Sequence, residues 1–211
     1  MGFVRRSITR IFTNYAKPDG PVGTFITAGM NPGHAKIRRW GLEHLTGLRP
    51  QRIVELGCGG GAAVRDLLRR YPEATVTGVD HSDVAVAMTE KVNRGAITAG
   101  RATAVLAAVT DLPFDDGTFD LATAFETVYF WPGPVESFRE VHRVLAPGGT
   151  FLVVNESDGG HPAEPVFSGI IEGIRFWTPE ELDGFLREAG FANVSIDHDT
   201  DRHRVVLRAV K

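Results

Sequence analysis

The sequence has 211 residues, enough for one domain with a substantial core, and its 43% hydrophobic and 23% charged content is typical of a globular protein. The net charge of −3 argues against a nucleic-acid partner, because phosphates require a basic surface. One cysteine excludes an internal disulfide, and no apolar run approaches the roughly 20 residues that span a bilayer.

The first element expected in chain order is an amphipathic helix. The segment 1–17, MGFVRRSITRIFTNYAK, is basic, lacks acidic residues and carries apolar residues at helical spacing. A transit peptide or a membrane-surface helix shares this pattern. We favour a helix that packs on the domain behind it, and we expect 1–48 to form an N-terminal helical cap.

The middle of the chain alternates strand-like and helix-like segments. Strands are expected at 52–57, 74–80, 103–109, 119–125 and 150–156, and helices at 61–71, 83–98 and 134–146. This order predicts a parallel sheet with helices on both faces. The connection DLPFDDGTFD should be mostly loop, and Pro147-Gly148-Gly149 should form the turn that caps the preceding helix.

The C-terminal part departs from this alternation. A helix is expected at 179–190, with Thr178 as N-cap and Glu181 placed for a capping box. The strand-like segments 191–198 and 203–210 are joined by a loop too short for a parallel crossover, so they should pair antiparallel. The fold class is therefore α/β, a doubly wound Rossmann-like sheet that is mostly parallel, in a single domain covering 1–211.

The segment VELGCGGG, residues 54–61, places four glycines directly after the first expected strand, where open α/β sheets bind ligands. Gly57, Gly59 and Ala62 also fit a loose dinucleotide fingerprint, which keeps NAD(P) binding open. Glu55 argues against it, because a carboxylate there repels a pyrophosphate and attracts an ammonium group.

A second acidic residue, Asp80, ends the next expected strand. A carboxylate at this position can accept hydrogen bonds from both hydroxyls of a ribose. The alternative role, capping the following helix, is better filled by Ser82 or Asp83. The two acids together indicate a ligand with a nucleoside end and an amino-acid-like end.

Four segments together resemble a known family: VELGCGGG, VTGVDHS, LPFDDGTFDLATAFETVYFWP and EVHRVLAPGGTFLVVNE. They look like class I S-adenosylmethionine-dependent methyltransferases, and most like small bacterial proteins with a methyltransferase-11-type domain. The resemblance is strong over 34–156. It implies a seven-stranded sheet with the last two strands reversed.

The resemblance also implies which residues bind the cofactor S-adenosyl-L-methionine. Glycine-loop residues would hold its methionine part, Asp80 its ribose and His81 its adenine, while the backbone of Phe125 would face the sulfonium. The acid that binds adenine in many relatives is missing at 107–109, so backbone groups of Ala108 and Val109 would replace it, with Asp111 the nearest acid. The implied loop residues are Glu55, Gly57, Cys58, Gly59 and Gly61.

Methyl transfer requires a base only when the nucleophile arrives protonated. Glu126 and Glu156 follow the fourth and fifth expected strands and are candidate bases, although each could instead anchor the cofactor's amino group or a loop. His34 is a third candidate, with helix capping as its alternative role. The seven histidines show no metal-ligand spacing, so no metal is expected.

The acceptor pocket should come from outside the Rossmann-like core. We expect 1–33 and the lid insertion 157–177 to close over the methyl group, although 157–177 could simply cover the sheet edge. Aromatic residues outside the strands would bind an apolar or aromatic acceptor. These are Tyr129, Trp131, Phe167 and Trp177.

Three functions compete at this point. The favoured one is methyl transfer from S-adenosylmethionine to a small molecule. The alternatives are an NAD(P)-linked oxidoreductase, which lacks a Tyr-x-x-x-Lys pair here, and a non-catalytic S-adenosylmethionine-binding protein. We expect a cytoplasmic bacterial protein, monomeric or homodimeric, with no nucleic-acid or membrane partner.

Overall fold

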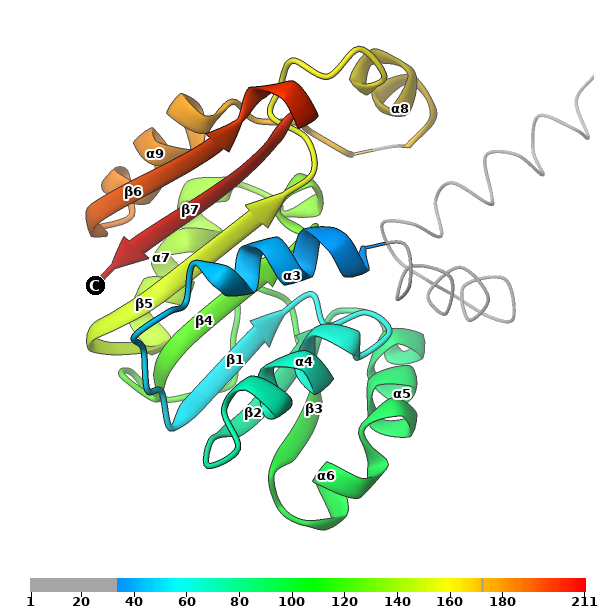
Figure 1. Cartoon of the computed structure of the whole chain (residues 1–211), viewed down its shortest axis with the longest axis vertical. Coiled ribbons are helices and arrows are strands. Elements are labelled where there is room, and N and C mark those ends of the chain that lie inside the picture. Colours follow the sequence, from blue (N-terminus) through cyan, green and yellow to red (C-terminus); the bar gives the residue numbers. More distant parts are fainter. Residues whose placement is uncertain (1–33, 172) are drawn as a thin grey trace, which may run out of the picture.

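The structure is a computed structural model that describes residues 34–211 except residue 172. The helix expected at 1–17 and most of the expected cap 1–48 therefore lie outside the described residues. The described chain forms one central sheet with helices packed on both faces (Figure 1). None of the described helices is long and apolar enough to span a membrane.

The sheet has the strand order β3-β2-β1-β4-β5-β7-β6. β7 is antiparallel to both neighbours, and the other pairs are parallel. The antiparallel C-terminal pair is confirmed, but only β7 is reversed, because it lies between β5 and β6. The strands are β1 Arg52–Leu56, β2 Thr75–Asp80, β3 Ala102–Leu106, β4 Phe119–Phe125, β5 Leu145–Asn155, β6 Ala192–Asp199 and β7 Arg204–Val210.

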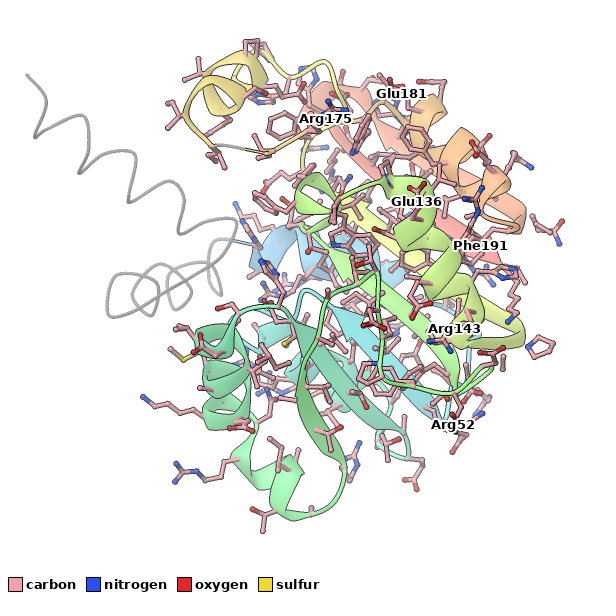
Figure 2. The ribbon with its side chains drawn as sticks, turned by 180° about the vertical axis from the view of Figure 1, so that it is seen from behind. Arg52, Glu136, Arg143, Arg175, Glu181 and Phe191 are labelled. Atoms are coloured by element: carbon pink, nitrogen blue, oxygen red, sulfur yellow. The ribbon has the colours of Figure 1, made fainter. Side chains whose placement is uncertain are left out.

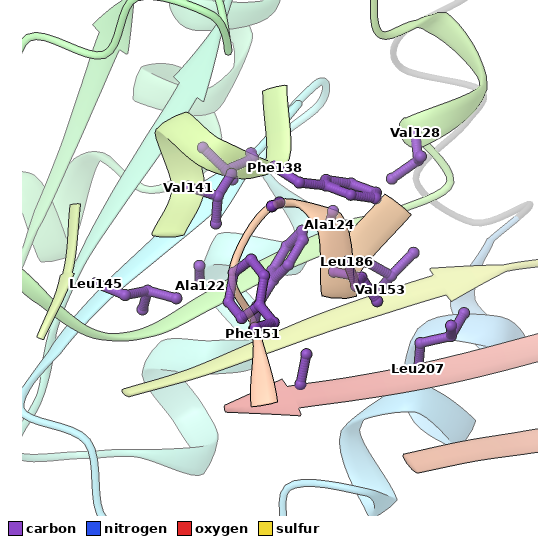
Figure 3. Close-up of a cluster of buried hydrophobic side chains, with 14 of the residues drawn as sticks. Ala122, Ala124, Val128, Phe138, Val141, Leu145, Phe151, Val153, Leu186 and Leu207 are labelled. Atoms are coloured by element: carbon purple, nitrogen blue, oxygen red, sulfur yellow. The ribbon is translucent and has the colours of Figure 1, made fainter. Parts of the chain in front are cut away.

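Two apolar clusters fix the helices on the sheet. α3 and α4 cover one face, where Ile37 and Leu67 pack with strand residues such as Leu152. α7 and α9 cover the other face (Figure 2), where Phe138 and Leu186 pack around β5 (Figure 3). The helices are α3 Ala35–Glu43, α4 Ala62–Arg70, α5 Asp83–Val92, α6 Arg94–Thr98, α7 Pro134–Val144, α8 Glu164–Ile170 and α9 Pro179–Glu188, with short 3₁₀ turns η1 Val128–Phe130 and η2 Thr200–Arg202.

The helix expected at 83–98 is broken at Asn93. This residue leaves the helical conformation, with φ −108° and ψ 18°, so that α5 ends and α6 begins around it. Its side-chain amide donates to the carbonyl oxygens of Thr89 and Gly61, at 2.9 and 3.0 Å. Asn93 therefore ties α5 to the glycine loop, a tertiary contact that helical periodicity does not show.

The turn expected at Pro147-Gly148-Gly149 is not a helix cap. α7 already ends at Val144, and Leu145 is extended. Gly148 has φ 76° and lies inside β5, next to a shift in the pairing with β4. Its N–H donates to the carbonyl of Lys211, whose N–H donates to Gly149, so the segment pairs with the end of β7 instead.

The connection from β3 to β4 is a loop, as expected. Arg143 on α7 holds it in place (Figure 2) by donating to the carbonyl oxygens of Leu112 and Phe114 at 3.0 and 2.8 Å. Glu140 accepts from the Leu112 N–H at 2.8 Å and pairs with the same arginine. These contacts fix the chain that runs past the ends of β2 and β3.

The capping box at the start of α9 is present. Thr178 Oγ1 accepts from the Glu181 N–H at 3.2 Å, and the Glu181 carboxylate accepts from the Thr178 N–H at 2.9 Å. We expect Thr178→Ala to lower the free energy of unfolding by about 1 kcal/mol, because one helix N–H loses its partner. Urea denaturation compared with Thr110→Ala, at an exposed loop position, measures this; equal losses in both variants would contradict the assignment.

Candidate active site

The glycine loop joins β1 to α4 at the edge of the sheet where the parallel strands end. Gly57 and Gly61 have φ values of 78° and 76°, which favour glycine. A Cβ atom at Gly57 would lie 2.2 Å from Thr127 Oγ1, and one at Gly61 would lie 2.7 Å from Asn93 Nδ2. These two glycines thus make room for the protein's own side chains, whereas a Cβ at Gly59 would meet only a backbone oxygen at 3.9 Å.

Asp80 lies at the end of β2 and faces this loop. Its carboxylate accepts from the N–H groups of Gly59 and Ser82, each at 3.0 Å. Burial raises the pKa of Asp80, against the effect of these two donors. Ser82, one of the two caps expected from the sequence, caps α5 by accepting from the Ala85 N–H at 3.3 Å. Asp80 is therefore not needed as the helix cap.

Glu55 lies beneath the loop and not in open space. It is 1% exposed, and Thr123 Oγ1 donates a hydrogen bond to its carboxylate. Burial raises the pKa of Glu55 well above its usual value, although Thr123 and the charge of Arg38 oppose the rise. Thr123 engages one oxygen of this buried carboxylate, and the expected attraction of Glu55 for an ammonium group stays a prediction.

The three candidate bases come together although they are far apart in the sequence. His34 precedes α3, Glu126 follows β4 and Glu156 follows β5. One side-chain nitrogen or oxygen of each lies within 4.8 Å of the others. Burial lowers the pKa of His34, and nearby Arg38 lowers it further. Two carboxylates and an imidazole thus share one small region at the end of the sheet.

Glu126 has the most perturbed surroundings of the three. Its backbone φ is 60°, an uncommon conformation for a residue with a side chain. Its Oε1 atom accepts from the Tyr129 hydroxyl at 3.3 Å and from the Glu156 N–H. Burial and then the charge of Glu156 raise the pKa of Glu126 to about 8. A carboxyl group with such a pKa is suited to accept a proton near neutral pH.

A cavity of about 360 Å³ opens beside this group. The segment 157–177 lines much of it, and Arg175 of this segment donates its N–H to the Tyr129 carbonyl at 2.9 Å. The rings of Tyr129 and Phe176 lie 5.2 Å apart. The lining residues are Glu126, Tyr129, Glu156, Ser157, His161, Glu164, Phe167, Phe176 and Arg202.

Two of the four expected acceptor-binding residues do not line this cavity. Trp131 packs in the core, with its ring 5.8 Å from that of Phe138 and stacked on Phe151 at 6.3 Å. Trp177 packs edge-on against Phe185 at 5.1 Å. Neither ring lies along this cavity, because Trp131 is buried under the α7–α9 layer and the half-buried Trp177 packs on α9. Tyr129 and Phe167 do lie along it.

Comparison with known proteins agrees with this geometry. Residues 54–153 match the family described as a methyltransferase domain. An uncharacterized methyltransferase of Synechocystis sp. is 33% identical over 77% of this chain and 76% of its own length. The chain belongs to the S-adenosylmethionine-dependent methyltransferase family.

Other relatives share a smaller part or only the fold. Cycloartenol-C-24-methyltransferase 1 of Oryza sativa subsp. japonica is 33% identical, over 51% of this methyltransferase and 31% of its own length. The solved geranyl diphosphate C-methyltransferase from Streptomyces coelicolor A3(2) superposes with a TM-score of 0.73 at 16% identity. It covers 84% of this chain and 79% of its own, which shows the same fold.

The remaining residues assigned to the cofactor lie around the same edge of this methyltransferase. Phe125 buries its ring against Gly41 of α3, so only its backbone can face the edge. His81 has an exposed ring 3.6 Å from Asp80 Oδ1. The Ala108 carbonyl accepts from the Asp111 N–H at 3.1 Å, which leaves it less available to adenine. Val109 follows in the same loop.

Cys58 contributes packing to the loop. Its side chain is 4% exposed, and Thr89 Oγ1 donates to its sulfur at 3.3 Å. Burial strongly raises the pKa of this thiol, so it is a neutral group. Its N–H donates to the Val79 carbonyl at 2.9 Å, and no ligand contact through the side chain is expected.

Sequence reasoning missed residues that connect the two halves of the site. Thr127 touches the Gly57 position with its hydroxyl and accepts from the Trp131 indole at 3.2 Å. It joins the glycine loop to the η1 turn that carries Tyr129. Its position directly after Glu126 was the sequence feature that could have identified Thr127 as a site residue. His161, in a loop, and Arg202, at the end of η2, also line the cavity, and no local sequence pattern reveals their positions.

Asp158 holds the start of the 157–177 segment against the C-terminal strands. Its Oδ2 atom lies 2.8 Å from His198 Nε2, and its Oδ1 atom lies 3.2 Å from His203 Nδ1. Burial would raise its pKa, but hydrogen bonds from His198, the Gly160 N–H and His203 outweigh burial. The pKa of Asp158 therefore lies below its usual value.

We expect Asp158→Asn to lower the free energy of unfolding by about 1–3 kcal/mol at neutral pH. Because the folded-state pKa is depressed, this stabilisation is present above the carboxyl's unfolded pKa and is lost as the pH falls through the folded one. Thermal unfolding should therefore show the two proteins converging below about pH 4. Asp201→Asn, at an exposed position, is the control. A difference that stays constant with pH would contradict the assignment.

Proposed function

We propose that this methyltransferase transfers the methyl group of S-adenosylmethionine to a small apolar or aromatic molecule bound in the cavity beside Glu126. One observation carries the proposal. The half-buried Glu126, whose pKa is raised, lies between the glycine loop, reached through Thr127, and the cavity, where Tyr129 donates a hydrogen bond to it. The edge of the sheet that would hold the cofactor and the cavity that would hold the acceptor therefore meet at a residue suited to remove a proton.

The residues at the edge fit the cofactor. Gly59 leaves open space above the loop for the methionine part, and Asp80 offers its carboxylate beside it for the ribose hydroxyls. His81 and the backbone near Val109 would lie against the adenine. When bound, S-adenosylmethionine supplies a methyl group attached to a sulfonium. The task of the chain is to align this group with the acceptor, which can supply several kcal/mol.

Glu126 is the proposed base, with Glu156 and His34 supporting it. The Tyr129 hydroxyl and the Glu156 N–H hold one carboxylate oxygen, which fixes the side chain in position. In this arrangement Glu126 accepts a proton from the acceptor as its nucleophilic atom approaches the methyl group. The segment 157–177 lines the cavity and would act as the lid that limits the access of water, and the expected contribution of 1–33 lies outside the described residues.

The alternatives receive less support. An NAD(P)-linked oxidoreductase would leave the Glu126 cavity without a role and would place a pyrophosphate near Asp80 and Glu55. A non-catalytic S-adenosylmethionine-binding protein would have no use for a proton acceptor beside the cofactor edge. Small molecules are also the acceptors of relatives such as cycloartenol-C-24-methyltransferase 1. We further propose a single domain over 1–211 in a cytoplasmic bacterial protein, monomeric or homodimeric.

The test is a screen with S-adenosylmethionine that carries a deuterated methyl group. Phenols, alcohols, amines and thiols with one aromatic ring are incubated with the full chain, and products are detected by mass spectrometry. The proposal predicts a labelled product together with S-adenosylhomocysteine. Reduction of a substrate with NADPH, without any labelled product, would favour the oxidoreductase.

A further inference from the structure

The cluster of His34, Glu126 and Glu156 has unoccupied hydrogen-bond acceptors, which suit a ligand that donates several hydrogen bonds. Tyr129 and the Glu156 N–H occupy only Oε1 of Glu126. In the described part of the chain, no hydrogen bond engages its Oε2 atom, the Glu156 carboxylate or the His34 ring. One side-chain nitrogen or oxygen of each of the three residues lies within 4.8 Å of the others. Three acceptors at about 2.9 Å from one ammonium nitrogen lie roughly 4.7 Å apart, so the group is compact enough to surround one ammonium ion.

The charges of the cavity also favour a cation. Besides Glu126, whose pKa is raised to about 8, the carboxyl groups of Glu156 and Glu164 lie among its described lining residues. The one arginine among them, Arg202, is paired with Asp199 at 2.9 Å. An acceptor with a carboxylate or phosphate would meet repulsion here, and a neutral hydroxyl would gain a hydrogen bond but not the attraction between opposite charges.

Aromatic rings complete the surroundings. Tyr129, Phe167 and Phe176 line the same cavity as the carboxyl groups of Glu126 and Glu156. Aromatic faces attract cations, and the attraction strengthens where water is excluded. The rings would also stack on an aromatic body attached to the charged group. The acidic cluster and the rings therefore favour the same kind of molecule.

We propose that the acceptor is a small primary or secondary amine, bound as its ammonium ion by Glu126, Glu156 and His34, with its apolar body against the rings. This inference rests on the proposed function and names its acceptor class. It also gives the two adjacent carboxylates a cation to bind, which lowers the cost of keeping them close.

The reaction then proceeds in balanced steps. The bound ammonium gives one proton to the Glu126 carboxylate and becomes a neutral amine with a free lone pair. The lone pair forms the bond from nitrogen to the methyl carbon while the bond from that carbon to sulfur breaks, its electrons remaining on sulfur. The products are a methylated ammonium ion and a neutral thioether, and Glu126 afterwards returns its proton to solvent.

The test compares two probes that differ only in the reacting group, 2-phenylethylamine and 2-phenylethanol. Isothermal titration of the full chain without cofactor is expected to show the amine binding about tenfold or more tightly. Glu156→Gln should remove most of this preference, whereas Glu43→Gln, at an exposed position of α3, should keep it. Circular dichroism checks that both variants fold.

Several results would overturn the inference. Equal or tighter binding of the alcohol would do so, as would an amine preference that survives in Glu156→Gln. Micromolar binding of Zn²⁺ or Mn²⁺ that His34→Ala abolishes, without an amine preference, would assign the cluster to a metal ion. Labelled methyl transfer to the alcohol and not to the amine would end this inference and leave the proposed function standing. Absence of S-adenosylhomocysteine binding to the full chain would contradict the proposed function itself.

Discussion

Asp80→Ala is expected to weaken S-adenosylmethionine binding by roughly 2–4 kcal/mol, about 30- to 900-fold in the dissociation constant. The variant removes the carboxylate proposed to accept hydrogen bonds from both ribose hydroxyls. It also leaves the N–H groups of Gly59 and Ser82 without their present acceptor, which loosens the glycine loop. Isothermal titration with S-adenosylmethionine measures the loss.

The control for this variant is Asp83→Asn, three residues further on at an exposed position in the first turn of α5. It changes a charge near the same edge without touching the proposed ribose site, so its affinity should equal that of the unaltered chain. Thermal unfolding separates a folding defect from a binding defect. An unchanged affinity for S-adenosylmethionine in a folded Asp80→Ala protein would contradict the assignment of Asp80 to the ribose.

Glu126→Gln is expected to reduce turnover by about 10²- to 10⁴-fold while cofactor affinity stays within a factor of about two. Glutamine keeps the shape of the side chain but cannot accept the proton. Because the pKa of Glu126 is raised to about 8, its basic form is the minor one at neutral pH. In the unaltered chain kcat/KM should therefore rise with pH up to about 8 and then level off, and this dependence should disappear in the variant.

Glu188→Gln provides the matched control, since this glutamate has a side chain that is 63% exposed on α9. Its kcat/KM and pH profile should follow those of the unaltered chain. Full turnover in Glu126→Gln, or an unchanged pH profile, would show that the proton leaves by another route. Glu156 would then be the next residue to test.

Local patterns were sufficient to predict most of the fold. The strands lie within a few residues of the expected ranges, because β-branched apolar runs fit buried parallel strands. The four-residue loop before β7 correctly required antiparallel pairing. The failures occurred where distant residues decide the local structure. Asn93 breaks a helix to reach the glycine loop, and Lys211 draws Gly148 into strand pairing.

The acidic residues of the candidate site could be selected from the sequence, but their arrangement in space could not. Strand ends marked Asp80, Glu126 and Glu156, because the carboxyl ends of parallel strands meet at one edge. Trp131, expected beside the acceptor, packs with Phe138 and Phe151 instead, because sequence does not tell which aromatic rings the α7–α9 layer buries. The contact between Glu55 and Thr123 was likewise invisible, since it depends on the register of β1 against β4.

The central claim is that this edge of the sheet binds S-adenosylmethionine, and its product S-adenosylhomocysteine offers the most direct measurement. Isothermal titration of the full chain with S-adenosylhomocysteine and, separately, with NADH compares the two candidate cofactors. We expect one S-adenosylhomocysteine to bind per chain with a dissociation constant of about 1 μM or lower, and NADH not to bind. Saturable binding of NADH with none of S-adenosylhomocysteine would contradict it.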